Sequence, residues 1–536
     1  MNKNVIIKLI MDRKKSRQKR NTRVIITNTF MAVTVVAIVA ILMLFAMGYS
    51  FNLSNGRIDQ SGLVEISSRP NGATVAIDGK VKFERTRISS MLSSGKHNIK
   101  ISKSGYDVWQ RDIDIEPGLL TNIDWIRLFP VQPELSDTVN FKELRLVSFS
   151  KDRRYLITVQ KNKNELQYIN LLDDKLQPKK IKLSTILGTS KDEVLEGNLS
   201  VISWNQTANK IILTWQHGED IFDYYLVDLQ NPEASINLTQ NFNLSFDKIS
   251  FANDAATKLW AVEAGNLHSI DSTNLAISAT LARNVESFTS DHDVVALVNT
   301  DDKDGRGIRI YRDGETGSTL IRSLEPEADK DHPAEESDDK HVASISLAMG
   351  TFWNDNWLAY SVDGRVRVLS GTYPSFAKPN DSQMTEEIKF ELAFIPKIIS
   401  VSDSNRIIIL SDGENVTSID IETRKHYNYK LDAPIKSVNW LDSYLFWQQV
   451  DNKIIVRDFD GANRREIITD ANNQLGITLT QDNNYLYRFD YRESKPAPVD
   501  CATAEGSTTV PSEAECSAEA PSSQSQYVLI REKLKV

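Results

Sequence analysis

Along most of the chain, short runs of apolar residues alternate with polar positions at a period of two. In the stretch GLVEISSRPNGATVAIDGK, residues 62–80, the apolar residues Ala73, Val75 and Ile77 share one parity. Alternation at period two is typical of β-strands that bury one face. No long segment after residue 50 has the 3.6-residue apolar period of an amphipathic helix. The pattern therefore predicts an all-β body.

One segment near the start departs from this pattern. Residues 24–50 contain no charged side chain, and residues 31–48 read MAVTVVAIVAILMLFAMG. A helix of about 18 or more apolar residues spans the hydrocarbon core of a bilayer. A secretory signal usually has an apolar core of only about 7–15 residues. The run favours an uncleaved transmembrane helix, and a signal peptide cut near Ala46 or Gly48 is the alternative.

The segment before this helix is strongly basic. Residues 1–23 carry nine Lys and Arg against one Asp, and because the whole chain has a net charge of −9 the remaining residues sum to −17. Lys and Arg gather on the cytoplasmic side of membrane helices. We therefore expect a single-pass protein of the cell membrane with a cytoplasmic N-terminus and everything after residue 50 outside. The residues expected to set this topology are Arg13, Lys14, Lys15, Arg17, Lys19, Arg20 and Arg23.

The acidic body argues against nucleic acid as a partner. Most non-specific affinity for nucleic acid comes from neutralising phosphates, and a body with a charge of −17 repels them. The short basic tail is expected to touch anionic lipid instead.

Two tight turns follow a polar stretch, residues 51–61, that reads as a spacer. The sequence PNG at residues 70–72 suits a β-turn, because proline presets φ and glycine closes the turn. The pair DG at residues 78–79 suits a two-residue hairpin. Strand-like alternation continues beyond them, so we expect a compact antiparallel β-sandwich over residues 62–130.

This segment resembles a PEGA domain, a family named for a Pro-Glu-Gly-Ala turn. One departure is that the family usually carries Thr-Pro between the two hairpins, whereas Thr86 is followed here by Arg87. The resemblance implies a small β-sandwich found outside bacterial and archaeal cells, often beside other modules, and it implies no catalysis. The turn residues that carry the resemblance are Pro70, Asn71, Gly72, Ala73, Asp78, Gly79, Gly105 and Tyr106.

Residues 131–536 repeat a unit of strand, turn, strand, turn, strand. The units start near residues 144, 199, 246, 285, 350, 396, 435 and 476. A period near 40–50 residues with three or four strands is typical of a β-propeller. The second strand of each unit is the most apolar, as expected when neighbouring blades cover both faces. We count eight blades, and seven is open because the first and last units can share one. Stacked β-sandwiches are the alternative fold.

The repeats lack a regular Trp-Asp dipeptide. They resemble, more loosely, the divergent propellers of bacterial envelope proteins of the TolB-like type, and that likeness implies no residue roles. Seven tryptophans in or beside the strands are expected mostly to pack between blades, and a few to line the channel or a face, where they stack on a sugar or peptide. They are Trp204, Trp215, Trp260, Trp353, Trp357, Trp440 and Trp447.

Two stretches look inserted into the repeat. Residues 324–341 are dense in acids and hold His332 and His341, which indicates a solvated loop, with weak binding of a divalent cation as the alternative. Residues 492–526 are rich in Ser, Pro, Ala and Glu and contain Cys501 and Cys516. Two cysteines in an extracytoplasmic region often pair, so we expect a disulfide. The final YVLIREKLKV returns as a strand, which fits a last blade completed by both chain ends.

The sequence carries no common catalytic motif. It has no Gly-x-Ser-x-Gly elbow, no His-Glu-x-x-His and no phosphate loop, so we expect no catalytic residue, no cofactor and no resident metal. The sequence therefore favours a non-enzymatic, membrane-anchored binding or scaffold protein of the cell envelope, which presents its propeller to a protein or a cell-wall glycan. The alternative is an extracytoplasmic hydrolase of the glycosidase type, with carboxylates around the channel. A weaker hypothesis is a sensor that relays through a membrane partner.

Overall fold

The computed structural model describes residues 25–44, 49–52, 57–189, 196–324, 343–378, 384–468, 475–492 and 526–534. It divides into two compact units, Met1–Val131 and Gln132–Val536. Several sequence predictions lie outside the described residues: the basic residues from Arg13 to Arg23, the histidines His332 and His341, and the cysteines Cys501 and Cys516.

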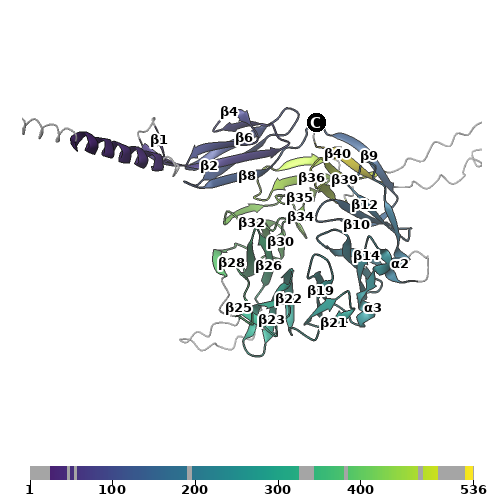
Figure 1. Cartoon of the computed structure of the whole chain (residues 1–536). Coiled ribbons are helices and arrows are strands. Elements are labelled where there is room, and N and C mark those ends of the chain that lie inside the picture. Colours follow the sequence, from purple (N-terminus) through teal and green to yellow (C-terminus); the bar gives the residue numbers. More distant parts are fainter. Residues whose placement is uncertain are drawn as a thin grey trace, which may run out of the picture. The chain divides into compact units, whose positions relative to one another are not determined.

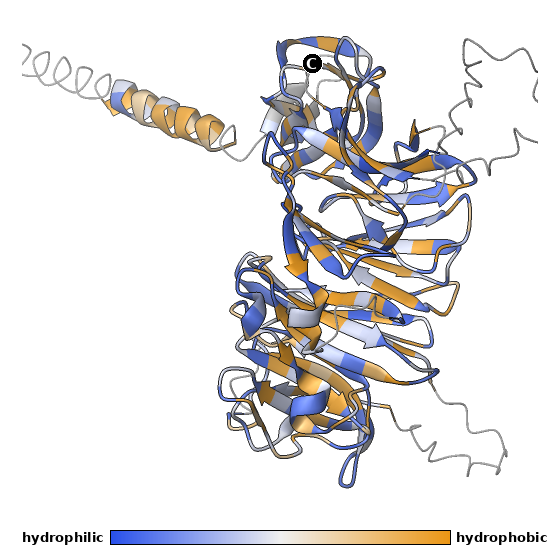
Figure 2. Ribbon diagram, turned by 90° about the vertical axis from the view of Figure 1, so that its right-hand side faces the viewer, coloured by the Kyte–Doolittle hydropathy of each residue, from blue (hydrophilic) through white to orange (hydrophobic). Residues whose placement is uncertain are grey.

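One helix, Ile25–Leu44, precedes the first sheet. It is 20 residues long with a mean hydropathy of 2.4, so it is long and apolar enough to cross a membrane. Figure 2 shows it as an almost continuous hydrophobic ribbon. Two threonine hydroxyls on the helix, those of Thr29 and Thr34, donate to carbonyls four residues earlier, those of Ile25 and Phe30. Their polar groups are therefore satisfied within the helix.

The first unit is a sandwich of two four-stranded sheets (Figure 1). One sheet holds β1 (Tyr49–Asn52), β2 (Arg57–Arg69), β5 (Ile88–Ser93) and β8 (Leu120–Arg127), and the other has the order β4 (Lys80–Arg85), β3 (Thr74–Ile77), β6 (Gly95–Ser102) and β7 (Trp109–Ile115). The period-two parities predicted from the sequence are those that face the core. Fully buried core residues are Val64, Ile66, Ala73, Val75, Ile99, Ile101, Trp109 and Ile123.

The polar stretch at residues 51–61, predicted to be a spacer, contributes paired strands to this unit. β1 pairs antiparallel with residues 57–60 at the start of β2. The spacer prediction for residues 51–61 was wrong because these residues have no period-two apolar pattern, which is the signal on which the strand predictions depend.

The predicted turns of the first unit form as expected. Asp78 and Gly79 have φ of +52° and +76° and join β3 to β4 as a two-residue hairpin turn. The Asp78 carboxylate lies 2.7 Å from His97 Nδ1 and accepts the Asn98 N–H at 2.9 Å, which ties this turn to β6. The peptide bond before Pro70 is cis.

Thr86 holds the turn at residues 70–72 against the end of β4. The bond between Thr86 and Arg87 is cis, at the point where the related family usually carries Thr-Pro. The Thr86 hydroxyl accepts the Ala73 N–H at 3.0 Å and lies 2.7 Å from Ser68 Oγ.

The second unit is a β-propeller of eight four-stranded blades (Figure 1). This settles the predicted choice between seven and eight. Blades one to four are β10 (Leu144–Phe149) to β13 (Lys179–Lys182), β14 (Asn198–Trp204) to β17 (Ile236–Asn237), β18 (Lys248–Phe251) to β21 (Ala276–Ile277), and β22 (Val285–Asp291) to β25 (Ser318–Ser323). Blades five to eight are β26 (Ile345–Phe352) to β29 (Thr385–Glu391), β30 (Ile398–Val401) to β33 (Lys425–Lys430), β34 (Asn439–Trp440) to β37 (Arg465–Ile468), and β38 (Ile477–Leu479), β39 (Tyr485–Arg492), β40 (Gln526–Lys533) and β9 (Glu134–Phe141).

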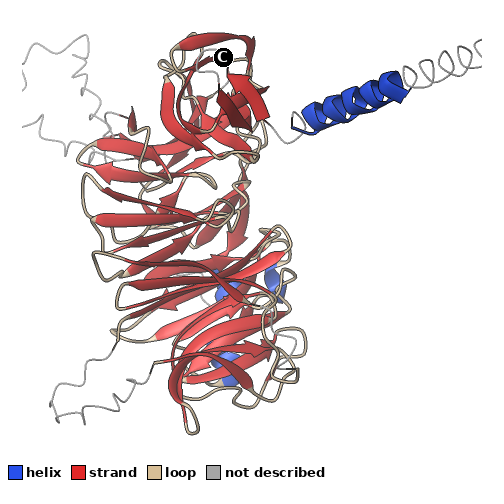
Figure 3. Ribbon diagram, turned by 90° about the vertical axis from the view of Figure 1, so that its left-hand side faces the viewer, coloured by secondary structure: helices blue, strands red, loops and turns tan. Residues whose placement is uncertain are grey.

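Within blades one to seven the strands follow in chain order, and the middle strands are largely buried. The second and third strands of blades one to seven are β11 (Tyr155–Gln160) and β12 (Glu165–Asn170), β15 (Lys210–Gln216) and β16 (Phe222–Asp228), β19 (Lys258–Glu263) and β20 (Asn266–Asp271), β23 (Val294–Asp301) and β24 (Gly305–Arg312), β27 (Asp355–Val362) and β28 (Arg365–Gly371), β31 (Ile407–Ser411) and β32 (Asn415–Asp420), and β35 (Leu445–Val450) and β36 (Lys453–Asp458). All five residues of β31 are buried, as its continuous apolar sequence predicted. Three short helical turns, α2 (Leu183–Leu187), η1 (Pro232–Ala234) and α3 (Leu238–Phe242), interrupt the strands (Figure 3).

Both ends of the propeller sequence close the ring. β9 pairs antiparallel with β40, so that Phe141 lies opposite Tyr527 and Glu134 opposite Lys533. Phe141, Phe489 and residues of β11 share one buried cluster between the last and first blades. The predicted closure by both chain ends is thus confirmed.

Most of the propeller tryptophans join neighbouring blades. Each of four indole N–H groups donates to a residue of the adjacent blade at 2.9–3.1 Å, and such bonds satisfy the polar edge of an otherwise buried ring. The pairs are Trp204 with Ser148, Trp260 with His292, Trp357 with Asn405, and Trp440 with Ser400.

Candidate binding pocket between the fifth and sixth blades

Trp353 differs from the other tryptophans in its exposure. It lies in the two-residue turn that joins β26 to β27, between the paired residues Phe352 and Asp355. Its side chain is 80% exposed, and its φ is +55°. A left-handed conformation costs an L-residue other than glycine about 1–2 kcal/mol. The chain therefore holds a large aromatic ring in water at a position that favours glycine or asparagine.

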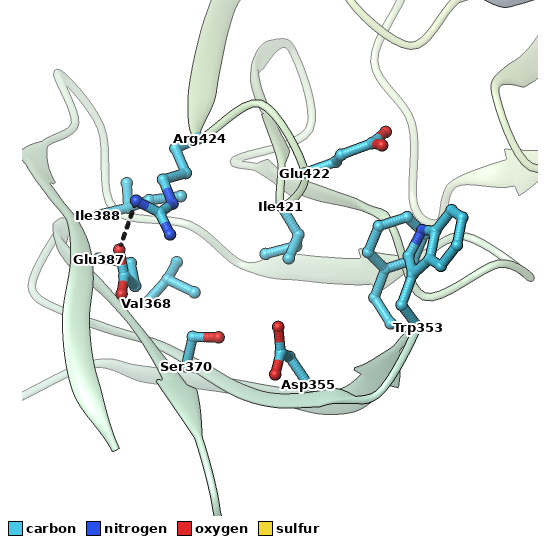
Figure 4. A pocket seen from close by; sticks show the side chains of 10 residues that line it. Trp353, Asp355, Val368, Ser370, Glu387, Ile388, Ile421, Glu422 and Arg424 are labelled. Carbon is cyan, nitrogen blue, oxygen red and sulfur yellow. Dashed lines mark ion pairs between the residues drawn. The ribbon is translucent and has the colours of Figure 1, made fainter. Parts of the chain in front are cut away.

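A pocket of about 280 Å³ opens beside this turn. Its floor consists of Val368, Ile388 and Ile421, which come from β28, β29 and the turn after β32. Figure 4 shows Trp353 at one end of the pocket and Asp355 pointing into the space beside it. The site therefore combines an aromatic wall, an apolar floor and polar groups at the rim.

An ion pair forms the opposite end of the pocket. Arg424 Nη1 lies 2.9 Å from a carboxylate oxygen of Glu387, as Figure 4 shows. Arg424 also has a positive φ, +58°, in the turn between β32 and β33. This pair joins the fifth blade to the sixth and neutralises the guanidinium that faces the pocket.

A buried ion pair supports the wall behind Glu422. Arg406 donates to both carboxylate oxygens of Asp420 at 2.9 and 2.8 Å, and the two side chains are only 3% and 2% exposed. Burial is the largest single influence on the pKa of Arg406 and lowers it, but the hydrogen bonds that Arg406 donates to Asp420, together with the negative charges of Asp420 and Glu422, raise that pKa on balance. Arg406 also pairs with Glu422, which lines the pocket.

The lining and its support are therefore negatively charged. Four carboxylates, those of Asp355, Glu387, Asp420 and Glu422, stand against the guanidiniums of Arg406 and Arg424. The formal charges of these six groups sum to −2, although Glu422 is itself paired with Arg406. Asp355 forms no ion pair with any described residue.

A second cavity, of about 390 Å³, lies where the first strands β10, β34 and β38 converge at the ring centre. Lys151, Arg153 and Asp403 line it, together with Trp440 and Trp447. Asp403 reaches water but is enclosed by the surrounding blades, and this burial raises its pKa, while the nearby Arg153 opposes the shift. Asp403 is the one carboxylate among the described residues that line this cavity.

The residues predicted from the sequence fall in three places. The turn residues from Pro70 to Tyr106 lie in the first unit, where Lys103 Nζ links two of the turns by donating to the Asn71 carbonyl at 2.7 Å and lying over the Tyr106 ring. Trp440 and Trp447 line the central cavity, and Trp353 lies on a face, as the general prediction allowed. Sequence reasoning missed the other lining residues, because they come from four separate segments between residues 352 and 424. Within the described ranges, no three His, Cys, Asp or Glu side chains are grouped as a metal site.

Comparison with known proteins supports the two-part organisation. Residues 61–126 match the model of the PEGA domain. The chain thus contains a PEGA domain followed by a β-propeller. No curated protein matches the chain.

Several solved propellers are similar at low identity. The β-propeller domain of Cps50 (Swd1) from Myceliophteria thermophila is 11% identical with a TM-score of 0.37 and covers 62% of this chain and 97% of its own. The C-terminal WD40 domain of Sif2 is 12% identical with a TM-score of 0.39, covering 74% and 97%. Dipeptidyl peptidase 4 of Porphyromonas gingivalis is 9% identical with a TM-score of 0.41, covering 65% and 56%.

Proposed function

We propose that this chain is a membrane-anchored binding or scaffold protein of the cell envelope, whose propeller lies outside the cytoplasm and holds a protein or a cell-wall glycan. The pocket beside Trp353 is the observation that supports this function most directly. Exposed aromatic rings that border a pocket are typical of binding sites, because they supply a large contact area at little entropic cost. The turn keeps this ring exposed despite the strain of a φ of +55°.

The proposed location depends on the apolar helix Ile25–Leu44 and on the charge before it. A helix of 20 residues suffices for one span, and nine basic residues precede it. PEGA domains act outside cells, which agrees with the same orientation. A cleaved signal peptide would also place both units outside, but without an anchor.

Two experiments on intact cells test this function. Protease added to unbroken cells should digest the propeller, and the chain should remain in the membrane fraction after a salt wash. Photocrosslinking from position 353 in living cells should then capture a discrete partner or cell-wall material. The same crosslinker at Glu219, an exposed residue between β15 and β16, is the matched control. A propeller that resists external protease but is digested in lysates would contradict the proposal.

We also propose that the propeller does not catalyse hydrolysis at its centre. A glycosidase needs two carboxyl groups about 5–10 Å apart. The described lining of the central cavity supplies Asp403 alone, and the two carboxylates near enough to raise its pKa, Asp442 and Asp152, are hydrogen-bonded to other residues and are not part of that lining. Incubating the purified chain with isolated cell wall tests this, and release of soluble sugar by the wild type but not by an Asp403→Asn variant would favour the enzyme instead.

A further inference from the structure

We propose that the cavity at the centre of the ring binds a free α-amino acid as its zwitterion, with the carboxylate held by the first blade and the ammonium group by the sixth. This site is separate from the pocket beside Trp353, so the inference goes beyond the function proposed above. Three features carry it: a guanidinium with an unused donor, a carboxylate on another blade, and apolar walls between them.

Arg153 supplies the unused donor. It lies in the turn between β10 and β11 and lines the cavity. Its Nη1 atom is buried, and no hydrogen-bond partner for it exists among the described residues. A buried donor without a partner is costly, and more so on a charged group. A carboxylate in the cavity would supply the missing acceptor.

The backbone at Arg153 shows that the turn itself does not call for arginine. Its φ is +61°, and its N–H donates to the Ser150 carbonyl at 2.9 Å. The same bond closes the corresponding turns of the second, sixth and eighth blades, where this position holds Ala208, Asn405 and Asn483, also at positive φ. Asparagine adopts this conformation more readily than arginine. A long cation kept at such a position points to a function at the cavity.

Asp403 brings the opposite charge from the turn between β30 and β31. Burial raises its pKa, and the charges of Arg153 and Lys151 oppose that shift, so both cations are near it. Within the described residues, however, no nitrogen of either cation lies within 4.0 Å of an Asp403 oxygen. Opposite charges therefore face one cavity without pairing, and a ligand that carries both signs would pair with each.

The neighbouring acids are engaged elsewhere. Asp152 pairs with Arg154 at 2.6 Å, and Asp442 accepts the N–H groups of Tyr444 and Leu445 at 2.8 Å. Neither acid lines the cavity. A zwitterion has no net charge, so its binding requires no excess of either sign around it.

The size and the walls of the cavity suit a small organic ligand. Its volume of about 390 Å³ falls within the range of about 300–1,000 Å³ that is typical of small-molecule sites. Apolar surface for a side chain comes from Val147, Val438, Trp440, Trp447 and Ile477. Head and side chain of an amino acid thus both find complementary parts of the lining.

A simple anion is the competing occupant. It would pair with Arg153 and Lys151, but it would be repelled by Asp403 and would leave the tryptophan walls without a contact. The arrangement of charges therefore favours the zwitterion.

Calorimetric titration of the purified full-length protein in detergent tests the inference. Each of the twenty standard amino acids is titrated singly. The one that binds most tightly is then compared with its amide, which lacks the carboxylate, and with its N-acetyl form, which lacks the ammonium group. We expect the loss of either charge to weaken binding about 10-fold or more, because each removes a hydrogen bond between charged groups.

Variants assign each charge to its residue. Arg153→Asn gives the first blade the residue that the sixth and eighth already carry, so the turn should form, and we expect the preference for the acid over the amide to disappear. Asp403→Asn should instead abolish the preference for the free amine over the N-acetyl form. Lys175→Gln removes a charge from the exposed turn between β12 and β13 and should leave every affinity unchanged.

Each outcome decides the question. The absence of binding by any amino acid would overturn the inference, and so would variants that keep both preferences. An N-acetyl form or acetate that binds as tightly as the free amino acid would overturn it as well and would assign the cavity to a simple anion. None of these results touches the function proposed for the pocket beside Trp353, which crosslinking from position 353 tests separately.

Discussion

Substitution of two tryptophans on one hairpin should change the stability of the fold by very different amounts. Trp353 lies in the turn between β26 and β27 and is 80% exposed, whereas Trp357 lies four residues later and is fully buried. We expect Trp353→Asn to leave the free energy of unfolding within about 1 kcal/mol of the wild type. We expect Trp357→Ala to lower it by about 3–5 kcal/mol.

The magnitudes follow from burial and backbone conformation. A tryptophan buries at most about 250 Å², and the buried fifth of Trp353 corresponds to about 50 Å², or about 1.3 kcal/mol at 25 cal/mol per Å². Asparagine tolerates a φ of +55° and relieves about 1–2 kcal/mol of strain, so the two effects nearly cancel. Trp357 has no such strain to relieve, and its loss also leaves the Asn405 carbonyl without the indole donor at 3.0 Å.

Urea unfolding followed by tryptophan fluorescence measures both variants. Each variant lacks one of the nine tryptophans, so both contain the same number of fluorescent indoles. If Trp353→Asn shifts the midpoint as far as Trp357→Ala does, the exposed ring supports the fold. The argument that it is retained for binding would then be refuted.

Three further predictions concern charged groups. Arg406→Met should lower the free energy of unfolding by about 3–5 kcal/mol, because it leaves the Asp420 carboxylate buried and unpaired. Adding Asp420→Leu should restore much of the lost stability, as measured by the midpoint of urea unfolding. Asp403→Asn should raise the stability of the folded chain at pH 7, because burial raises the pKa of Asp403 above 3.8 and ionisation in the folded state therefore costs stability. Thermal melts should show that this gain disappears below pH 3.8. Asp78→Asn should lower the stability of the folded chain at pH 7, because the hydrogen bond from His97 lowers the pKa of Asp78 and so stabilises its ionised form. This contribution is present above pH 3.8 and is lost as the pH falls further, so thermal melts of the two proteins should converge at low pH. A difference that does not depend on pH would contradict the prediction.

The alternation of apolar residues was enough to predict the strands that are buried on at least one face. β3, β6 and β7 bury the predicted parities, and the continuous apolar run of β31 is buried on both faces. These strands were predictable because burial of their apolar side chains is the main term that stabilises them, and this burial requires apolar residues at every second position of the sequence. The two-residue turn at Asp78 and Gly79 was predictable for a different reason, since few residues tolerate positive φ.

Strands that bury little were invisible to the same reasoning. In β9 only Phe141 is buried, and the alternation of its apolar residues Leu135, Val139 and Phe141 is broken by Asp137. The outer strands β17 and β21 span two residues each, too few for any period to appear. Blade count was therefore open in the sequence, because the strand that completes the eighth blade is one of these.

The pocket was hidden for a third reason. Its walls come from β27, β28, β29 and the turn after β32, and only the pairing of two adjacent blades brings them together. One local signal was present: tryptophan in a two-residue turn is unusual, because such turns favour glycine, asparagine or aspartate. A turn residue that opposes its own backbone preference can therefore mark a functional site when no motif does.

The strand that closes the ring also ties the propeller to the preceding domain. The first unit ends at Val131 and β9 begins at Glu134, so any force transmitted along the chain from the first unit reaches the propeller through β9. At this end β9 is fastened to β40 by an exposed ion pair between Glu134 and Lys533, which is worth at most about 1 kcal/mol. At its far end Phe141 is 1% exposed within the cluster between the last and first blades, where loss of a phenylalanine costs about 3–5 kcal/mol. If the helix Ile25–Leu44 is held in a membrane, as proposed above, force on it would reach β9 at the end fastened by this ion pair, and opening of the ring would also require extraction of Phe141.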